Sequence, residues 1–190
     1  MRILMLGNSF TYFNDLPGLL ASMTGWEIDS HTRGGAYLFE HLDPQAELGA
    51  KTLPALEKQK WDIVILQEQS RGPYERREAF MDSVCALCDM SRKAGAVPLL
   101  YATWAYREGS QKLLETGLSY TQMLDALTES YHAAAKENGA LIADVGLAFA
   151  KERNALDLYV SDDYHPSSEG TMLAAKTIAA CIREHLSTAR

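Results

Sequence analysis

An α/β fold built on a parallel sheet is predicted, because short apolar runs alternate with longer amphipathic segments along the whole chain. The apolar runs have the length of strands, and the segments between them have the periodicity of helices. No linker rich in proline, glycine or serine, no internal repeat and no low-complexity segment divides the 190 residues. A single domain over residues 1–190 is therefore expected, with enough interior for one central sheet.

Five segments are expected to be strands. Residues 2–6 form a short apolar run typical of a buried parallel strand, and residues 26–32 alternate enough for a second strand. Further strands are expected at residues 63–66, 97–102 and 141–145. Because helical sequence separates them, right-handed crossovers should join them into a three-layer sandwich with the flavodoxin-like strand order 2-1-3-4-5.

Glycine and proline mark the ends of the expected helices. Helical pieces from about residue 38 to residue 58 should be interrupted by Pro44 and Pro54. The other expected helices are residues 16–23, ending at Gly25; residues 75–93, stopping at Gly95; a strongly periodic segment that starts at Tyr120 and ends at Gly139; and residues 171–186.

A serine follows the first strand directly. Gly7 ends that strand and permits a tight turn, so Ser9 lies at the carboxyl end of the strand, where open α/β sheets place their sites. A helix is expected to begin soon afterwards, so the backbone N–H groups after Ser9 can point at an anion. The alternative is a polar turn in which Ser9 and Thr11 only cap that helix.

An aspartate and a histidine lie three residues apart near the other end of the chain. A serine hydroxyl becomes a good nucleophile when an imidazole removes its proton, and the imidazole needs a carboxylate on its other ring nitrogen. Asp162 can meet His165 across one turn, and Pro166 biases His165 away from helical dihedrals and into a loop. Asp163 is the less favoured partner, because the adjacent position points its side chain elsewhere. The alternative is a helix-capping turn with a surface histidine.

Taken together, Gly7-Asn8-Ser9 and the Asp162–His165 pair resemble the SGNH hydrolase superfamily, also called the GDSL-like esterases and lipases. The resemblance implies that Ser9 is the nucleophile, His165 the base and Asp162 the acid that orients it. It also implies an oxyanion hole formed by the N–H of Ser9, a glycine N–H and an asparagine side chain. Gly34-Gly35, after the second strand, matches the glycine block, with Gly35 as the expected donor.

Two positions depart from the pattern of that superfamily. The usual Gly-Asp-Ser is Gly-Asn-Ser here, which removes a charge beside the serine. The Gly-x-Asn-Asp block is missing, and a Leu-Gln-Glu-Gln-Ser segment that resembles a divergent branch stands in its place. A glutamine also has an NH₂ donor, one methylene further out. Gln69 takes the asparagine position in an ungapped alignment, and Gln67 is the alternative.

Composition excludes several classes of partner. The net charge of −7 argues against nucleic acid or an anionic membrane as the main partner, and no apolar stretch approaches the length of a membrane span. The N-terminal apolar run leads directly into Ser9, so cleavage of a signal peptide there would remove the nucleophile, and a cytoplasmic location is expected. Three cysteines are too few for a disulfide scaffold, and Cys85 and Cys88 are expected to pack in a helix.

The predicted function is hydrolysis of a small acyl ester by a serine–histidine–aspartate triad, without a cofactor or a metal. An acetyl ester of a carbohydrate is the favoured substrate. Trp104 and Tyr106, just beyond the fourth strand, are expected to be walls of the substrate pocket; packing on a neighbouring helix is the alternative. A competing interpretation is a non-enzymatic flavodoxin-like module that binds a phosphate or flavin group after the first strand. Metal-dependent hydrolysis through Asp162, Asp163 and His165 is a third, for which the sequence offers no further ligands.

Overall fold

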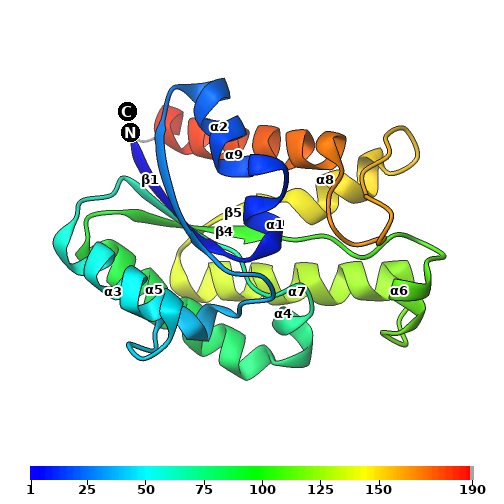
Figure 1. Ribbon diagram of the computed structural model, residues 1–190, viewed down its shortest axis with the longest axis horizontal. Coiled ribbons are helices and arrows are strands. Elements are labelled where there is room, and N and C mark those ends of the chain that lie inside the picture. Colours follow the sequence, from blue (N-terminus) through cyan, green and yellow to red (C-terminus); the bar gives the residue numbers. More distant parts are fainter. Residues whose placement is uncertain (189–190) are drawn as a thin grey trace.

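The computed structural model describes residues 1–188 and has three layers, with one sheet between two layers of helices (Figure 1). The strand order is β2-β1-β3-β4-β5, as predicted, and all neighbouring strands pair in parallel. The strands are β1 Arg2–Gly7, β2 Glu27–Thr32, β3 Ile63–Leu66, β4 Val97–Ala102 and β5 Leu141–Asp144.

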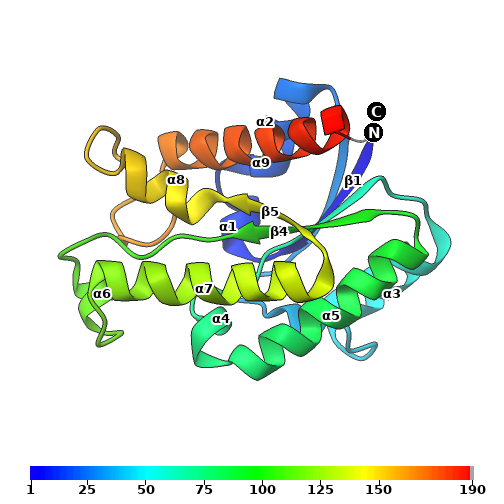
Figure 2. The same cartoon turned by 180° about the vertical axis from the view of Figure 1, so that it is seen from behind.

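Helices cover both faces of the sheet (Figures 1 and 2). On one face, α9 (Ser168–Thr188) packs against α2 (Leu16–Thr24) and α8 (Val145–Glu152). On the other face, α5 (Arg77–Lys93) packs against α3 (Glu47–Lys58) and α7 (Tyr120–Asn138). The shorter segments are α1 Ser9–Tyr12, η1 Phe13–Asp15, η2 Leu38–His41, α4 Gly72–Glu75 and α6 Gln111–Leu114.

The central strands are apolar at successive positions because helices cover both of their faces. Residues 3–6 of β1 are fully buried, and so is every residue of β3. The edge strand β2 instead exposes Glu27, Asp29 and Ser30. These polar side chains suit the outermost strand of a sheet, since charges discourage edge-to-edge association.

The structure corrects the expected interruption at Pro54. Pro44 lies between η2 and α3, as predicted, but Pro54 lies inside α3, which continues to Lys58. Proline removes one helical hydrogen bond. The burial of Ala55 and Leu56, which follow Pro54, offsets that loss, because most helical stability in proteins comes from packing of the apolar face.

Two other element boundaries differ from expectation. The helix expected over residues 75–93 is divided into α4 and α5 at Arg76, which has non-helical dihedral angles of φ −128° and ψ 45°. The fifth strand ends at Asp144, and Val145 begins α8, which was not predicted. Gly146 weakens the helical signal of α8, but a Cβ there would lie 2.3 Å from the carbonyl oxygen of Thr103. The close approach of α8 to the segment after β4 therefore requires this glycine.

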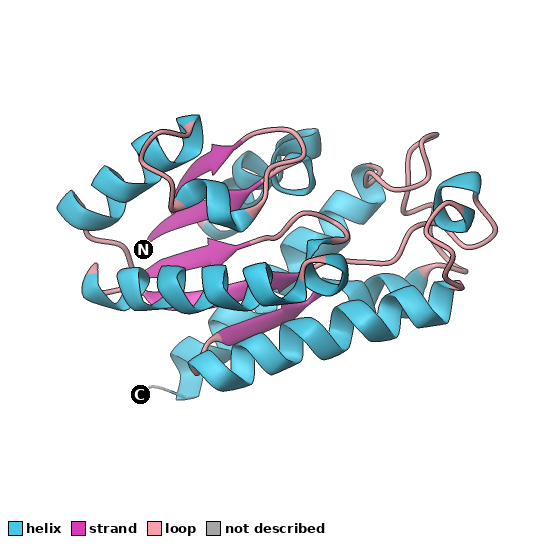
Figure 3. Ribbon diagram, turned by 90° about the horizontal axis from the view of Figure 1, so that it is seen from below, coloured by secondary structure: helices cyan, strands magenta, loops and turns pink. Residues whose placement is uncertain are grey.

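The parallel sheet brings the carboxyl ends of its strands to one edge (Figure 3). Ser9 follows β1, Gly35 follows β2 and Gln69 follows β3. The segment that precedes α9 contains Asp162 and His165. The topology thus places these distant parts of the sequence in the loops at one edge of the sheet.

Candidate active site

Ser9 is the first residue of α1, and its position is set by the residues around it. Asn8 caps this helix by accepting a hydrogen bond from the N–H of Phe10 (3.0 Å), and its Nδ2 donates to the carbonyl oxygen of Ala36 (3.0 Å). An aspartate at position 8 could not donate the second bond. Asparagine in place of the usual aspartate therefore ties the Ser9 loop to the loop that contains Gly35.

Asp162, His165 and Ser9 form a continuous chain of hydrogen bonds. His165 Nδ1 lies 2.8 Å from Asp162 Oδ2, and His165 Nε2 lies 2.8 Å from Ser9 Oγ. The other carboxylate oxygen of Asp162 accepts from the N–H groups of Tyr164 (3.1 Å) and His165 (2.9 Å). Burial opposes ionisation of Asp162, but the bonds from His165 and the backbone outweigh it and lower the pKa of this carboxyl.

Aromatic rings orient the imidazole of His165. Phe13 stacks on it with ring centroids 4.6 Å apart, Tyr164 lies at 4.0 Å, and Phe10 meets it edge-on at 5.7 Å. Asn14, with φ 51°, donates from Nδ2 to the carbonyl oxygen of Pro166 (2.9 Å). Asparagine tolerates this left-handed conformation better than most residues. These contacts join the loop of Ser9 to the loop of His165, and the sequence did not reveal them.

Asp163 faces away from the imidazole. It has φ 66°, and its Oδ1 lies 2.8 Å from Nε of Arg107. Arg107 also pairs with Asp157 (2.9 Å) and donates to the carbonyl oxygen of Tyr159 (2.9 Å). The structure thus pairs His165 with Asp162 and uses Asp163 to hold the loop, as the spacing favoured.

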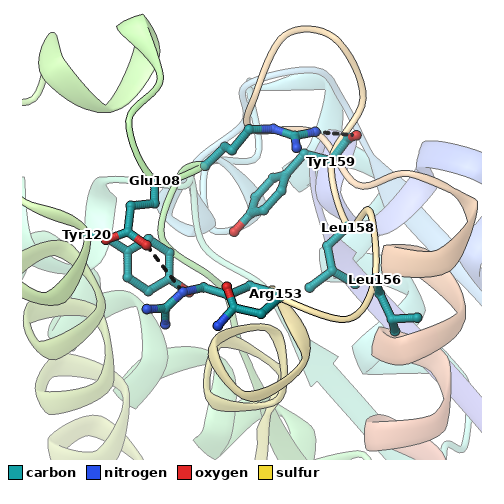
Figure 4. A pocket seen from close by; sticks show the side chains of 8 residues that line it. Glu108, Tyr120, Arg153, Leu156, Leu158 and Tyr159 are labelled. Carbon is teal, nitrogen blue, oxygen red and sulfur yellow. Dashed lines mark hydrogen bonds and ion pairs between the residues drawn. The ribbon is translucent and has the colours of Figure 1, made fainter.

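A cavity of about 290 Å³ lies beside this arginine-held loop (Figure 4). Arg107 and Tyr159 line it, and Arg153 and Glu108 form an ion pair there (3.4 Å). None of Ser9, Asp162 and His165 lines it. This cavity lies apart from the hydrogen bonds that join Asp162, His165 and Ser9. It is a space beside the loop that the Arg107–Asp163 pair holds.

A smaller cavity of about 110 Å³ lies directly at Ser9. Its lining residues are Asn8, Ser9, Phe10, Gly35, Gln69, Ser70 and Tyr164. A second cavity, of about 180 Å³, shares Gln69, Ser70 and Tyr164 with it and adds the polar side chains of Arg71, Tyr106, Lys112 and Glu115. The two adjacent cavities give Ser9 a small compartment and a more polar one.

The chain is 43% identical to a protein of solved structure from Slackia heliotrinireducens, described as a putative SGNH hydrolase. The match covers 96% of this chain and 98% of that one, with a TM-score of 0.90. The chain belongs to the SGNH hydrolase superfamily. This confirms the predicted resemblance to that superfamily, and the protein is an SGNH-type hydrolase.

More distant structures share the SGNH fold. A DUF4886 family protein from Bacteroides uniformis is 22% identical, with 95% of this chain and 82% of that chain covered and a TM-score of 0.71. An acetylxylan esterase from Geobacillus stearothermophilus is 16% identical, with 95% and 93% covered and a TM-score of 0.69. No family model matches the chain, and no curated protein matches it.

The two glutamines that follow β3 in this SGNH hydrolase have different surroundings. Gln67 is buried; its Oε1 accepts from the N–H of Asn8 (2.9 Å) and from Oγ1 of Thr11 (2.9 Å), and its Nε2 donates to the carbonyl of Glu68. A Cβ at Gly7 would lie 2.5 Å from that Oε1, so glycine there makes room for Gln67. Gln67 does not line the cavity at Ser9.

Gln69 lines that cavity. Its Oε1 accepts from the N–H groups of Arg71 (2.8 Å) and Gly72 (3.1 Å), and its Nε2 donates to Ser70 Oγ at 3.3 Å. The amide is thereby oriented through its oxygen, while one N–H of the NH₂ group has no partner within residues 1–188. The backbone N–H groups of Ser9 and Gly35 also make no hydrogen bond to any of the residues that the structure describes.

Trp104 lines neither of the two cavities near Ser9, contrary to expectation. It is 0% exposed and lies between Phe10 (ring centroids 4.5 Å apart) and Phe149 (4.1 Å), with its Nε1 donating to the carbonyl of Tyr164 (3.0 Å). Tyr106 does line the second cavity, where its hydroxyl lies 2.7 Å from Ser70 Oγ. Both Trp104 and Tyr106 are buried, so their position just after a strand does not show which of them lines a cavity. Tyr164 is the aromatic side chain that lines both cavities.

The structure gives no support to a metal site at the Asp162–His165 loop. Asp163 pairs with Arg107 rather than converging with Asp162 and His165. Over residues 1–188, no group of three His, Cys, Asp or Glu side chains is arranged to hold a metal ion. Within the same residues, no helix is both long enough and apolar enough to cross a membrane.

Proposed function

We propose that the protein is a serine esterase that hydrolyses small acyl esters through an acyl-enzyme. The single observation that supports this most is the chain of 2.8 Å contacts from Asp162 through His165 to Ser9. With its proton on Nδ1, His165 donates to Asp162 and accepts from Ser9, which is the tautomer that a general base requires. Asp162 is held ionised by its hydrogen bonds, so it can stabilise the imidazolium that forms.

The reaction proceeds in two steps. Ser9 Oγ attacks the ester carbonyl while its proton passes to His165 Nε2. The tetrahedral intermediate collapses, the bond to the alkoxy oxygen breaks, and His165 returns the proton to the leaving alcohol. Water then attacks the acyl-enzyme with His165 as the base, which releases the carboxylic acid and restores the Ser9 hydroxyl.

The oxyanion is stabilised by donors on three loops. The N–H of Ser9, the N–H of Gly35 and the free N–H of Gln69 Nε2 all belong to residues that line the cavity at Ser9. Gly35 adopts φ 68°, a left-handed conformation that glycine accepts without strain. Preorganised donors of this kind act on the charge that develops in the transition state, where they have most effect on rate.

The cavities favour a short acyl group and a polar alcohol. The cavity at Ser9 has about 110 Å³, whereas pockets for drug-sized ligands have roughly 300–1,000 Å³. The adjoining cavity is lined by hydroxyl and charged groups, which suit the hydroxyls of a sugar better than a lipid chain. An acetyl ester of a carbohydrate is therefore the proposed substrate class, and the fold shared with an acetylxylan esterase is compatible with it.

The alternative of a phosphate- or flavin-binding module has less support. In such a module the hydroxyls of the loop after β1 face the ligand. Here the Ser9 hydroxyl is bonded to His165, and the Thr11 hydroxyl donates to Gln67. His165 and Asp162 would have no role in that function.

Labelling with a fluorophosphonate tests the proposal. We expect the wild-type protein to be phosphonylated at Ser9, as located by peptide mass spectrometry, and His165→Ala to react at least about 100-fold more slowly, since general-base help is worth about 10²–10⁴. His132→Ala is the matched control, because His132 bonds Asp144 away from the cavity. Unlabelled Ser9 in a protein that still hydrolyses p-nitrophenyl acetate would argue against the proposal.

Substitution of the two glutamines separates their roles. Gln69→Ala should lower kcat by about 100-fold with little change in KM, because a donor to the transition-state oxyanion is lost. Gln67→Ala should lower the free energy of unfolding by about 1–3 kcal/mol, because the N–H of Asn8 and the hydroxyl of Thr11 lose their buried acceptor. Steady-state kinetics of both variants measure kcat and KM, and urea unfolding measures their free energies of unfolding. An unchanged kcat in Gln69→Ala would exclude Gln69 as the donor.

A further inference from the structure

Glu68 is a buried acid that the mechanism does not use. Its residue surface is 1% exposed, and within residues 1–188 it forms no ion pair. It lies between Gln67, which supports the Ser9 loop, and Gln69, which lines the cavity. An unpaired carboxylate is costly to bury, so its contacts indicate what it does.

The carboxylate of Glu68 joins two segments that border the cavity at Ser9. Its Oε1 accepts from the N–H of Gln69 (2.6 Å), and both of its oxygens lie 3.3 Å from the N–H of Leu38. Leu38 begins η2, three residues after Gly35. One carboxylate therefore contacts the backbone of the segment that provides Gln69 and the backbone of the segment that follows Gly35.

The surroundings of Glu68 leave it little freedom. A Cβ at Gly72 would lie 2.8 Å from Glu68 Cγ, so glycine lets α4 pack directly on this side chain. The N–H of Glu68 donates to the hydroxyl of Tyr131 on α7 (3.3 Å). The side chain is thus fixed against a helix on one side and bonded to both loops on the other.

We propose that Glu68 is a positioning residue for the oxyanion hole, whose carboxylate sets the placement of the Gly35 segment relative to Gln69. The inference rests on the proposed esterase function. Oε1 accepts from the N–H groups of both Gln69 and Leu38, and Oε2 is a second acceptor for Leu38, whereas an amide in the same place replaces one of these oxygens with an NH₂ donor that has no acceptor. Loss of the second acceptor should therefore place the oxyanion donors of the Gly35 segment and Gln69 less accurately. Because these donors act mainly in the transition state, stabilisation of the transition state should fall more than binding of the ester.

Ionisation of Glu68 is expected to affect stability as well. Burial raises the pKa of Glu68 to about 7, although the hydrogen bonds from the two N–H groups lower this pKa in part. The charge of Glu40 raises the pKa further and that of Arg76 lowers it, and the hydroxyl of Tyr131 is a third neighbouring group. The folded protein therefore binds this proton more tightly than the unfolded chain does. The stability that the protonated group contributes is fully present below pH 4.5 and is lost as the pH rises through about 7.

Glu68→Gln tests the inference, with Glu78→Gln, an exposed position of α5, as the matched control. At pH 8 we expect Glu68→Gln to lower kcat for p-nitrophenyl acetate by about 10-fold, less than loss of a whole donor, with KM unchanged within about twofold. The affinity for a trifluoromethyl ketone, whose serine adduct places an anionic oxygen in the hole, should fall in parallel. The loss of stability between pH 4.5 and 7 should be smaller than in wild type.

Two comparisons decide the outcome. A Glu68→Gln protein that keeps its kcat and its affinity for the trifluoromethyl ketone overturns the inference. If Glu68→Gln does not fold, Glu68→Asp has the same expectation, because the shorter carboxylate cannot reach both N–H groups, and an unchanged kcat there overturns it equally. Ser9→Ala measured alongside separates the two proposals: full activity in Ser9→Ala overturns both, whereas lost activity there with full kcat in Glu68→Gln overturns this one alone.

Discussion

Replacement of Ser9 by alanine is expected to lower kcat/KM for p-nitrophenyl acetate by about 10⁴-fold or more, which leaves only the contribution of the oxyanion donors and binding. The reason is geometric, because Ser9 Oγ is the hydroxyl that lies 2.8 Å from His165 Nε2. Stability should be nearly unchanged, since Asn8 rather than Ser9 caps α1. The release of p-nitrophenol measures kcat/KM, and thermal unfolding measures stability.

The matched control for Ser9 is Ser30→Ala on the exposed edge strand β2, which should keep wild-type activity. A Ser9→Ala protein that is folded and retains even a tenth of the wild-type kcat/KM would contradict the role of Ser9. Activity lost equally in both variants would indicate a general effect on the preparation rather than loss of a nucleophile.

The neighbouring aspartates should respond very differently to substitution. Asp162→Asn is expected to lower kcat by about 10²–10⁴-fold, because an amide at this position no longer favours the His165 tautomer whose Nε2 accepts the serine proton. Asp163→Asn should change kcat by less than about threefold, since Asp163 contacts Arg107 and asparagine tolerates its φ of 66°. Steady-state kinetics of the two variants compare them directly.

The contrast between the two aspartates is its own control, because both variants make the same chemical change one residue apart. A large loss in Asp163→Asn with little change in Asp162→Asn would reverse the assignment of the acid. Equal losses would point to the integrity of the loop, rather than the hydrogen bond to His165, as the quantity that matters.

The sheet was predictable because most of its strands are short apolar runs that are easily recognised in the sequence. Four of them are apolar at nearly every position, as parallel strands covered on both faces must be. The observed order is the flavodoxin-like order, which is common among sheets in which strands and helices alternate. Pro54 and α8 were missed for a common reason. In α3 and α8, packing against the rest of the chain outweighs a local signal that opposes a helix, from Pro54 in one case and Gly146 in the other.

Spacing in the sequence predicted contacts of the candidate site only where the residues lie close together in the chain, whereas the pairing of His165 with the distant Ser9 was expected from the resemblance to the SGNH hydrolases. Asp162 and His165 lie on one turn, so their pairing could be read from their spacing. The separate environments of Gln67 and Gln69 could not, because they depend on Asn8, Thr11 and the Gly35 segment, all distant in sequence. The burial of Trp104 between Phe10 and Phe149 has the same origin.

The proposed esterase function depends on the transfer of an acyl group to Ser9. Acid quenching of the protein within the first turnovers of p-nitrophenyl acetate, followed by peptide mass spectrometry, tests it most directly. The expected result is an acetyl group on the peptide that contains Ser9, together with a burst of p-nitrophenol equal to the enzyme present, and neither in Ser9→Ala. Steady hydrolysis by the wild-type protein with no burst, and with an acetyl group on another residue that persists in Ser9→Ala, would contradict it.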